Sequence, residues 1–200
     1  MFTLTSSFDS DNSKCENNFV FIDKIIAKKS KTNLCEIKGT ALKKIAIFVD
    51  VQNIYYTTRD AYQRQFNYRL LWQELLAKGD IVEATAYAIA RSDDQQHKFQ
   101  KALKHIGFEV KLKPFIQRSD GSAKGDWDVG ITIDIMTAAA KQDIDTIVLL
   151  SGDGDFDMLL SHIKAEYHVN TIVYGVPKLT ANSLINATDE YYKIDHSLLL

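Results

Sequence analysis

The segment that decides the fold is "IDTIVLLSGDGDF" (residues 144–156), an apolar run followed at once by acids and glycines. Such a short run of Ile, Val and Leu is typical of a buried strand. Asp153 and Asp155 stand where this strand must end, with Gly152 and Gly154 beside them. In an open parallel sheet, ligands bind beyond the carboxyl ends of the strands. We therefore expect this segment to form a site at a sheet edge, with the glycines leaving room for an ion and a phosphate.

Strand and helix patterns alternate on both sides of this segment. Apolar runs that predict further strands are "KKIAIFVD" (43–50), "IVEATAYAIA" (81–90), "FEVKLKPF" (108–115) and "VNTIVYGV" (169–176), and "EYYKID" (190–195) predicts a late edge strand. Amphipathic or largely apolar helical patterns lie between them. The alternation predicts an α/β fold with an open, mainly parallel sheet and helices on both faces, and a strand order of 3-2-1-4-5 would make the first and fourth strands neighbours.

The first part of the chain differs in composition from the rest. Residues 1–42 begin with a polar stretch and contain one short amphipathic pattern, so we expect an N-terminal arm that is partly disordered or forms a short helix. Residues 43–200 are expected to form the α/β domain. Cys15 and Cys35 both fall in the arm. They indicate free thiols in a reducing compartment, with a disulfide between them as the alternative.

The overall composition limits the kinds of function. With 24 basic and 26 acidic residues the net charge is −2, so no basic excess advertises tight binding to polyphosphate. This argues against a nucleic-acid packaging role but not against a nucleic-acid enzyme, which needs only a local basic rim. No long apolar segment and no signal-peptide pattern are present in the sequence. We expect a soluble, cytoplasmic protein that does not bind membranes.

Carboxylates follow two strands that the predicted order makes neighbours. Asp50 ends the first strand and Asn53 follows it at the start of a helix. Asp153 and Asp155 end the fourth strand. If these strands are adjacent, Asp50 and Asp153 lie side by side.

Three more acids belong to the helix predicted at 126–142, which leads into the fourth strand. Asp126 is expected at or near the N-cap, and Asp128 could reach the same sheet edge. Asp134 falls in an apolar row of the helix, where an acid is uncommon unless it is paired. Lys124 precedes these acids and is either a phosphate contact or a solvated side chain.

A cation resolves the repulsion within such a group of acids. Two like charges 4 Å apart repel by roughly 4 kcal/mol at an effective dielectric constant of 20. Clustered carboxylates therefore take up protons or bind a cation. A hard divalent ion with oxygen ligands suits them, and it also lowers the pKa of water and neutralises charge on a phosphate. The sequence favours metal-assisted hydrolysis of a phosphodiester.

Two other readings of the acidic segment fit less well. Asp153, Asp155 and Asp157 have the spacing of an EF-hand loop, but Met158 and Lys164 stand where that loop needs Gly and Glu. A haloacid-dehalogenase-type phosphatase would need a second Asp two residues after Asp50, where this chain has Gln52.

Three segments taken together resemble the NYN domain family, the PIN-like nucleases that include LabA-type proteins. They are "IAIFVDVQNIYY" (45–56), "KGDWDVGITIDIM" (124–136) and "IVLLSGDGDFDMLLSHIKAEYHVNTIVYG" (147–175), and the tail "SLINATDEYYKID" (183–195) is similar to the family's ending. The resemblance covers roughly residues 43–196 and implies a PIN-like fold with a divalent-metal ribonuclease site.

The resemblance also implies roles for individual residues. The residues that match the acidic site, both catalytic and metal-binding, are Asp50, Asp128, Asp153 and Asp155, and those that match supporting positions are Asn53, Lys124, Asp126, Asp134 and Ser151. Either Asp126 or Asp128 could be the site acid, and we favour Asp128 because it lies six residues before Asp134.

The implied cofactor is Mg²⁺ or Mn²⁺ and the implied partner is RNA, with a homodimer as one option for the assembly. The alternative is a catalytically inactive regulatory module that binds RNA or a protein partner.

Overall fold

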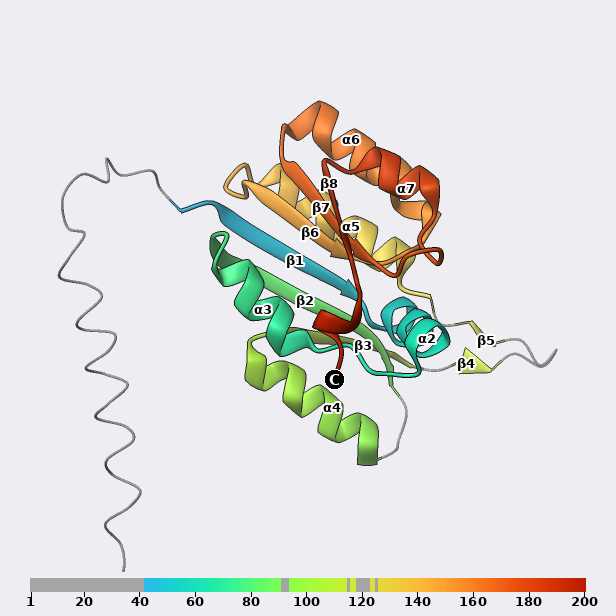
Figure 1. Ribbon diagram of the computed structural model, residues 1–200. Helices are drawn as coiled ribbons and strands as arrows, with labels where there is room; N and C mark the ends of the chain where they lie inside the picture. The colour runs from blue at the N-terminus through green and yellow to red at the C-terminus, as the bar shows by residue number, and fades with distance from the viewer. Residues whose placement is uncertain (1–41, 91–93, 115, 118–122, 125) are drawn as a thin grey trace, which may run out of the picture. The chain divides into compact units, whose positions relative to one another are not determined.

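The computed structural model describes residues 42–200 except 91–93, 115, 118–122 and 125. A 6-stranded sheet has the order β3-β2-β1-β6-β7-β8 (Figure 1). Its strands are β1 (Lys44–Asp50), β2 (Asp80–Ala90), β3 (Glu109–Pro114), β6 (Thr146–Leu150), β7 (Asn170–Gly175) and β8 (Glu190–Lys193). Every neighbouring pair is parallel. The predicted order is confirmed, and the late strand is β8 at the edge.

Helices cover both faces of the sheet, as predicted (Figure 1). They are α2 (Val51–Tyr62), α3 (Tyr68–Leu76), α4 (Asp94–Ile106), α5 (Asp128–Ala140), α6 (Asp157–Tyr167) and α7 (Asn182–Ala187), with short 3₁₀ turns η1 (Gly154–Phe156) and η2 (His196–Leu198). Buried side chains of α2, α3, α4 and η2 belong to one core, and those of α5, α6 and α7 belong to the other.

The central strand β1 shows how the sequence divides between these cores. Its residues from Ile45 to Val49 are all buried. Ile45, Ile47 and Val49 pack with the α2–α4 layer, whereas Ala46 and Phe48 pack with the α5–α7 layer. Alternate residues of a strand point to opposite faces, so a continuous apolar run is what a strand covered on both faces requires. The hydrophobic effect thus fixes β1 in the middle of the sheet.

A small hairpin outside the sheet was not predicted from the sequence. Strands β4 (Ile116–Gln117) and β5 (Ala123–Lys124) pair in antiparallel fashion just before α5. The predicted arm, at 1–42, lies outside the described residues apart from its last residue, as do both cysteines, and it stays a prediction. No helix in the described part of the chain is long and apolar enough to cross a membrane.

Candidate metal centre

The carboxyl ends of β1 and β6 meet at one edge of the sheet. Val49 pairs with Leu150, so the residues that follow them, Asp50 and Ser151, leave the sheet side by side. The Ser151 hydroxyl donates to Oδ2 of Asp50 across a long 3.5 Å distance. Strand order therefore brings together two segments that lie about a hundred residues apart in the sequence.

Asp50 is buried beneath this edge. Its Oδ1 accepts a hydrogen bond from the backbone N–H of Asn53 at 3.1 Å, which makes Asp50 the N-cap of α2. Burial raises the pKa of the Asp50 carboxyl to about 6, although the Asn53 hydrogen bond opposes this rise. The negative charges of Asp128 and Asp153 raise it further. A carboxyl in this state is close to taking up a proton unless a cation is present.

Three carboxylates form a compact group, and two of them, Asp128 and Asp153, act electrostatically on Asp50. Asp128 begins α5, Asp153 follows β6, and Asp155 lies in η1. Each can place an oxygen so that all three oxygens lie within 4.8 Å of one another. Burial raises the pKa of Asp128, and repulsion from Asp153, Asp126 and Asp155 adds to the rise. Only oxygen donors are present in this group, which fits a hard divalent ion such as Mg²⁺ or Mn²⁺.

Two neutral side chains hold the acidic loop in place. Oδ1 of Asn53 accepts from the backbone N–H of Gly152 at 2.8 Å, and the Ser151 hydroxyl accepts from the backbone N–H of Asp153 at 3.2 Å. Asp153 in turn accepts from the backbone N–H of Asp155 at 3.0 Å. The loop after β6 is thus tied to α2 and to itself, so its two acids are oriented by the protein.

The glycines of this loop serve close packing against the protein. A side-chain Cβ on Gly152 would lie 2.5 Å from the Leu179 carbonyl oxygen, and one on Gly154 would lie 3.0 Å from the Ala181 Cβ. Neither glycine has a positive φ; among the described glycines only Gly107 does. The expected role, room for an ion and a phosphate, is therefore not the one the structure shows. The space is needed by the segment after β7.

Asp134 lies apart from the three acids, further along α5. The helical rise places it roughly 9 Å beyond Asp128. Its Oδ2 accepts from the Tyr87 hydroxyl at 2.6 Å and from the Lys111 ammonium at 2.7 Å. Burial would raise the pKa of Asp134, but these two donors outweigh it and lower the pKa. The pairing that the sequence led us to expect is present, and it ties α5 to β2 and β3.

The segment before α5 shows which of Asp126 and Asp128 belongs to the acidic group, a choice that the sequence left open. Asp128 belongs to the three-acid group, whereas the Asp126 side chain is exposed and the N-cap position is taken by Trp127. The Trp127 indole donates to the Ala88 carbonyl at 2.9 Å, which fixes the start of α5 against β2. Lys124 lies in β5.

Sequence reasoning missed one residue beside this group, Lys113 at the end of β3. Its ammonium donates to the Asp126 carbonyl at 2.8 Å and lies 5.2 Å from the Trp127 ring centroid. The alternation "KLK" at residues 111–113, on a strand that ends at the same edge, was the available signal.

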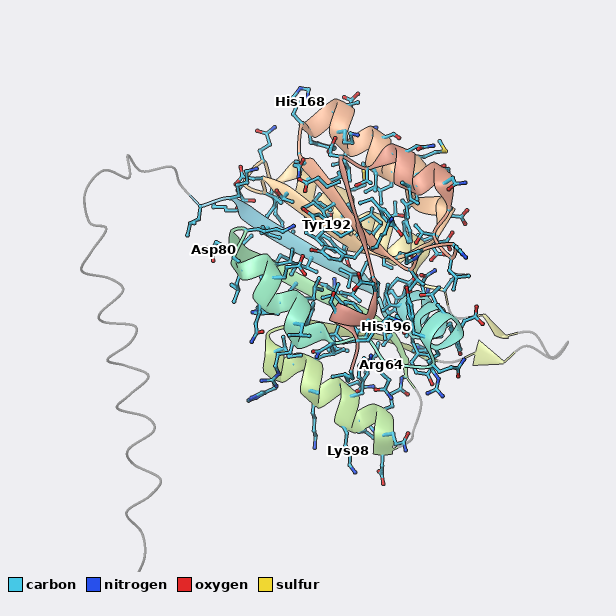
Figure 2. The ribbon with its side chains drawn as sticks, in the orientation of Figure 1. Arg64, Asp80, Lys98, His168, Tyr192 and His196 are labelled. Carbon is cyan, nitrogen blue, oxygen red and sulfur yellow. The ribbon has the colours of Figure 1, made fainter. Side chains whose placement is uncertain are left out.

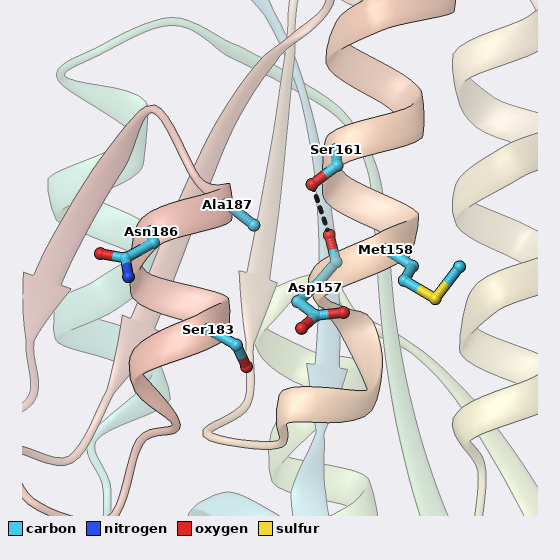
Figure 3. A pocket seen from close by; sticks show the side chains of 6 residues that line it. All are labelled: Asp157, Met158, Ser161, Ser183, Asn186 and Ala187. Carbon is cyan, nitrogen blue, oxygen red and sulfur yellow. Dashed lines mark hydrogen bonds between the residues drawn. The ribbon is translucent and has the colours of Figure 1, made fainter.

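Other features of the surface do not join the acidic group. A hollow of about 450 Å³ lies between α6 and α7 and is lined by Asp157, Met158, Ser161, Ser183, Asn186 and Ala187 (Figure 3). Two histidines, His168 at the end of α6 and His196 against Tyr62, lie well apart from each other (Figure 2). None of the residues that line this hollow belongs to the three-acid group, and Asp155 is exposed. Within the group, Asp155 is exposed, whereas Asp128 and Asp153 are partly buried.

An open parallel sheet with carboxylates gathered at its carboxyl edge is the arrangement of the PIN-like nuclease class. The family model described as the NYN domain matches residues 44–195. The chain belongs to the NYN domain family, as its motifs indicated.

Two individual proteins show the same relationship. The Low amplitude and bright protein LabA of Synechococcus elongatus is 29% identical over 163 residues, which cover 76% of this chain and 84% of LabA. A protein of unknown function from Vibrio parahaemolyticus is 49% identical to this chain in sequence, and its crystal structure matches the present structure with a TM-score of 0.76. The match covers 82% of this chain and 100% of that one. The fold and the LabA-type resemblance are confirmed.

Proposed function

We propose that this protein is a divalent-metal-dependent ribonuclease that hydrolyses RNA phosphodiester bonds at its aspartate cluster. One observation carries the proposal: oxygens of Asp128, Asp153 and Asp155 lie within 4.8 Å of one another, and the charges of Asp128 and Asp153 also act on the buried Asp50. Four acids so placed repel one another strongly without a cation. The proposed ion is Mg²⁺ or Mn²⁺.

The acids are proposed to bind the ion in different ways. Asp50, Asp128 and Asp153 are proposed to bind it directly or through water, since Mg²⁺ accepts only one or two carboxylates and keeps several waters. Asp155 completes the set or orients the attacking water. When bound, the ion supplies Lewis-acid stabilisation of the phosphate charge and lowers the pKa of water. In-line attack would leave a 5′-phosphate and a 3′-hydroxyl.

The remaining predicted residues have supporting roles in this proposal. Asn53 holds the loop after β6 against α2, because its side chain accepts a hydrogen bond from the Gly152 N–H. Ser151 holds the same loop from within, because its hydroxyl accepts from the Asp153 N–H. Asp134 holds α5 in position against β3 through its ion pair with Lys111. Lys124 and Asp126 precede α5, and we propose that they support the site from beside the grouped acids. Asn53 is also proposed to position a ligand or phosphate, and Lys124 to contact a phosphate, because catalysis needs its reacting groups held in place.

The exposure of Asp155 supports a polymeric substrate. Small-molecule sites are concave and enclose most of their ligand. Asp155 is exposed at the surface beside the partly buried Asp128 and Asp153, so a chain of RNA can reach the group from solvent.

A second candidate is a regulatory module without catalytic activity that binds RNA or a protein. The net charge of −2 favours the protein-binding form of this module, because phosphate contacts by basic side chains dominate the affinity of nucleic-acid-binding proteins. The clustered acids favour the enzyme, since an inactive module has no need for repelling carboxylates. A cytoplasmic location and a homodimer stay predictions.

Cleavage of a diverse RNA pool with Mn²⁺ separates these candidates. We expect products with 5′-phosphate ends from the wild type and none from Asp50→Asn or Asp153→Asn. Asp60→Asn makes the same charge change at an exposed position of α2 and is the matched control. The nuclease proposal is wrong if the wild type cuts no RNA, or if both site variants cut as fast as the control.

A further inference from the structure

We propose that Lys113 forms a phosphate subsite beside the acidic group, where it positions the RNA backbone. Lys113 is the second-last residue of β3 and pairs with Ile89 of β2. All strands of the sheet are parallel, so the end of β3 lies at the same edge as the ends of β1 and β6. The inference rests on the proposed nuclease function and names the group that receives its substrate.

The structure holds the Lys113 side chain in one place. Its ammonium donates to the Asp126 carbonyl at 2.8 Å and lies over the Trp127 ring, 5.2 Å from the centroid. Trp127 is itself fixed, because its indole N–H donates to Ala88 and its ring packs 5.3 Å from the Tyr87 ring. A cation over an aromatic face is stabilised by the ring's quadrupole. Lys113 is therefore pre-positioned next to the first residue of α5, Asp128.

Comparison with Lys111 shows why Lys113 is available to a substrate. Residues two apart on a strand share a face, so both lysines point toward α5. Lys111 is neutralised by Asp134, with 2.7 Å between nitrogen and oxygen. Within the described residues, Lys113 makes no ion pair with a carboxylate, and its recorded hydrogen bond goes to a neutral carbonyl. An ammonium has three donors, so two remain for phosphate oxygens.

The net negative charge of the grouped acids explains why a positive side chain would help to bind RNA here. Asp50, Asp128, Asp153 and Asp155 carry up to four negative charges, and one divalent ion cancels two of them. A phosphodiester that approaches this edge still meets net repulsion, which a fixed ammonium reduces. Lys113 also acts electrostatically on Asp128: burial and the neighbouring acids raise the pKa of Asp128, and the positive charge of Lys113 opposes this rise. The same cation that attracts RNA must therefore weaken metal binding slightly.

This double effect allows a test that distinguishes a substrate contact from a structural role. RNA affinity is measured by fluorescence anisotropy with a labelled single-stranded oligoribonucleotide on the Asp153→Asn background, in which no cleavage is expected. On this background Lys113→Gln should weaken RNA binding about tenfold, the lower range for a hydrogen bond to a charged group. The slope of log K against log salt should fall by about 0.7, the loss of one phosphate contact on a single strand.

Three further arms complete the experiment. Lys113→Arg should restore most of the RNA affinity, because it keeps the charge. Lys98→Gln, on the exposed side of α4 (Figure 2), is the matched control and should leave affinity and slope unchanged. On the wild-type background, calorimetry should show that Lys113→Gln binds Mn²⁺ as tightly as the wild type or more tightly. A purely structural role would weaken both ligands together.

The results separate this inference from the nuclease proposal. If the wild type cleaves RNA but Lys113→Gln binds RNA with unchanged affinity and salt slope, the subsite is wrong and the nuclease stands. If the wild type cleaves no RNA, the nuclease proposal fails, while the anisotropy series still decides whether Lys113 contacts phosphate. Joint loss of RNA and Mn²⁺ binding in Lys113→Gln would overturn the subsite by showing a structural defect.

Discussion

Replacing Asp50 by Asn should stabilise the metal-free protein while greatly reducing the stabilisation that it gains from metal. Asn keeps the shape of the side chain and is an equally good N-cap, so the hydrogen bond from Asn53 survives. What disappears is the ionised carboxylate. Its pKa rises from 3.8 to about 6 in the folded protein. This rise corresponds to about 3 kcal/mol of unfavourable free energy when the group is charged.

The pH dependence follows from the direction of this shift. A raised pKa means that the folded state binds the proton more tightly than the unfolded state, so Asp50 causes no destabilisation below its unfolded pKa. The wild type loses stability as the pH rises from about 4 to above 6, and the loss is complete near pH 8. The variant should be more stable than the wild type by about 3 kcal/mol at pH 8 and by roughly half as much at pH 5.

Urea unfolding in EDTA at these two pH values measures the difference. Asp60→Asn controls for the change in net charge and should stay within about 0.5 kcal/mol of the wild type. With Mn²⁺ at a hundred times its Kd, the wild type should gain about 2.7 kcal/mol and Asp50→Asn much less. An Asp50→Asn protein that is less stable than the wild type in EDTA at pH 8 would refute the reasoning.

Three further substitutions test the parts of the site separately. Gly152→Ala should lower the free energy of unfolding by about 1–3 kcal/mol, because the new Cβ would lie 2.5 Å from the Leu179 carbonyl oxygen; an unchanged melting temperature would contradict this. Asp134→Asn should destabilise by about 1 kcal/mol, because it loses the partly exposed Lys111 pair, yet its melting temperature should rise with Mn²⁺ as much as in the wild type. Asn53→Ala should cost about 1–3 kcal/mol by leaving the Gly152 N–H without its acceptor, and calorimetry should show weaker Mn²⁺ binding.

The sequence was most informative where long-range order follows from strand pattern. Continuous apolar runs at 45–49 and 147–150 predict central strands, and the strand order 3-2-1-4-5 of a PIN-like sheet makes them neighbours. Once they are adjacent, the acids that follow them must meet. The juxtaposition of Asp50 with the loop after β6 could therefore be predicted without any knowledge of side-chain positions.

The sequence was less informative where side-chain contacts decide. Asp126 and Asp128 lie two residues apart, yet only Asp128 joins the three-acid group while Asp126 is exposed. The "KLK" pattern places Lys111 and Lys113 on one face of β3, but it does not show that the Lys113 ammonium contacts the Asp126 carbonyl and the Trp127 ring. The partner of Asp134 was also hidden, since an apolar row shows that an acid needs a partner but not that Lys111 supplies it.

Isothermal titration calorimetry of Mn²⁺ into the metal-free wild type and Asp153→Asn tests the central claim most directly. Asp153 lies in the three-acid group, and its side chain accepts the Asp155 N–H, so Asn keeps the loop geometry while removing one ligand charge. We predict saturable binding to the wild type and binding at least tenfold weaker, about 1.4 kcal/mol, in the variant. No saturable heat from the wild type, or equal affinity in Asp153→Asn, would contradict the assignment of this edge as a metal centre.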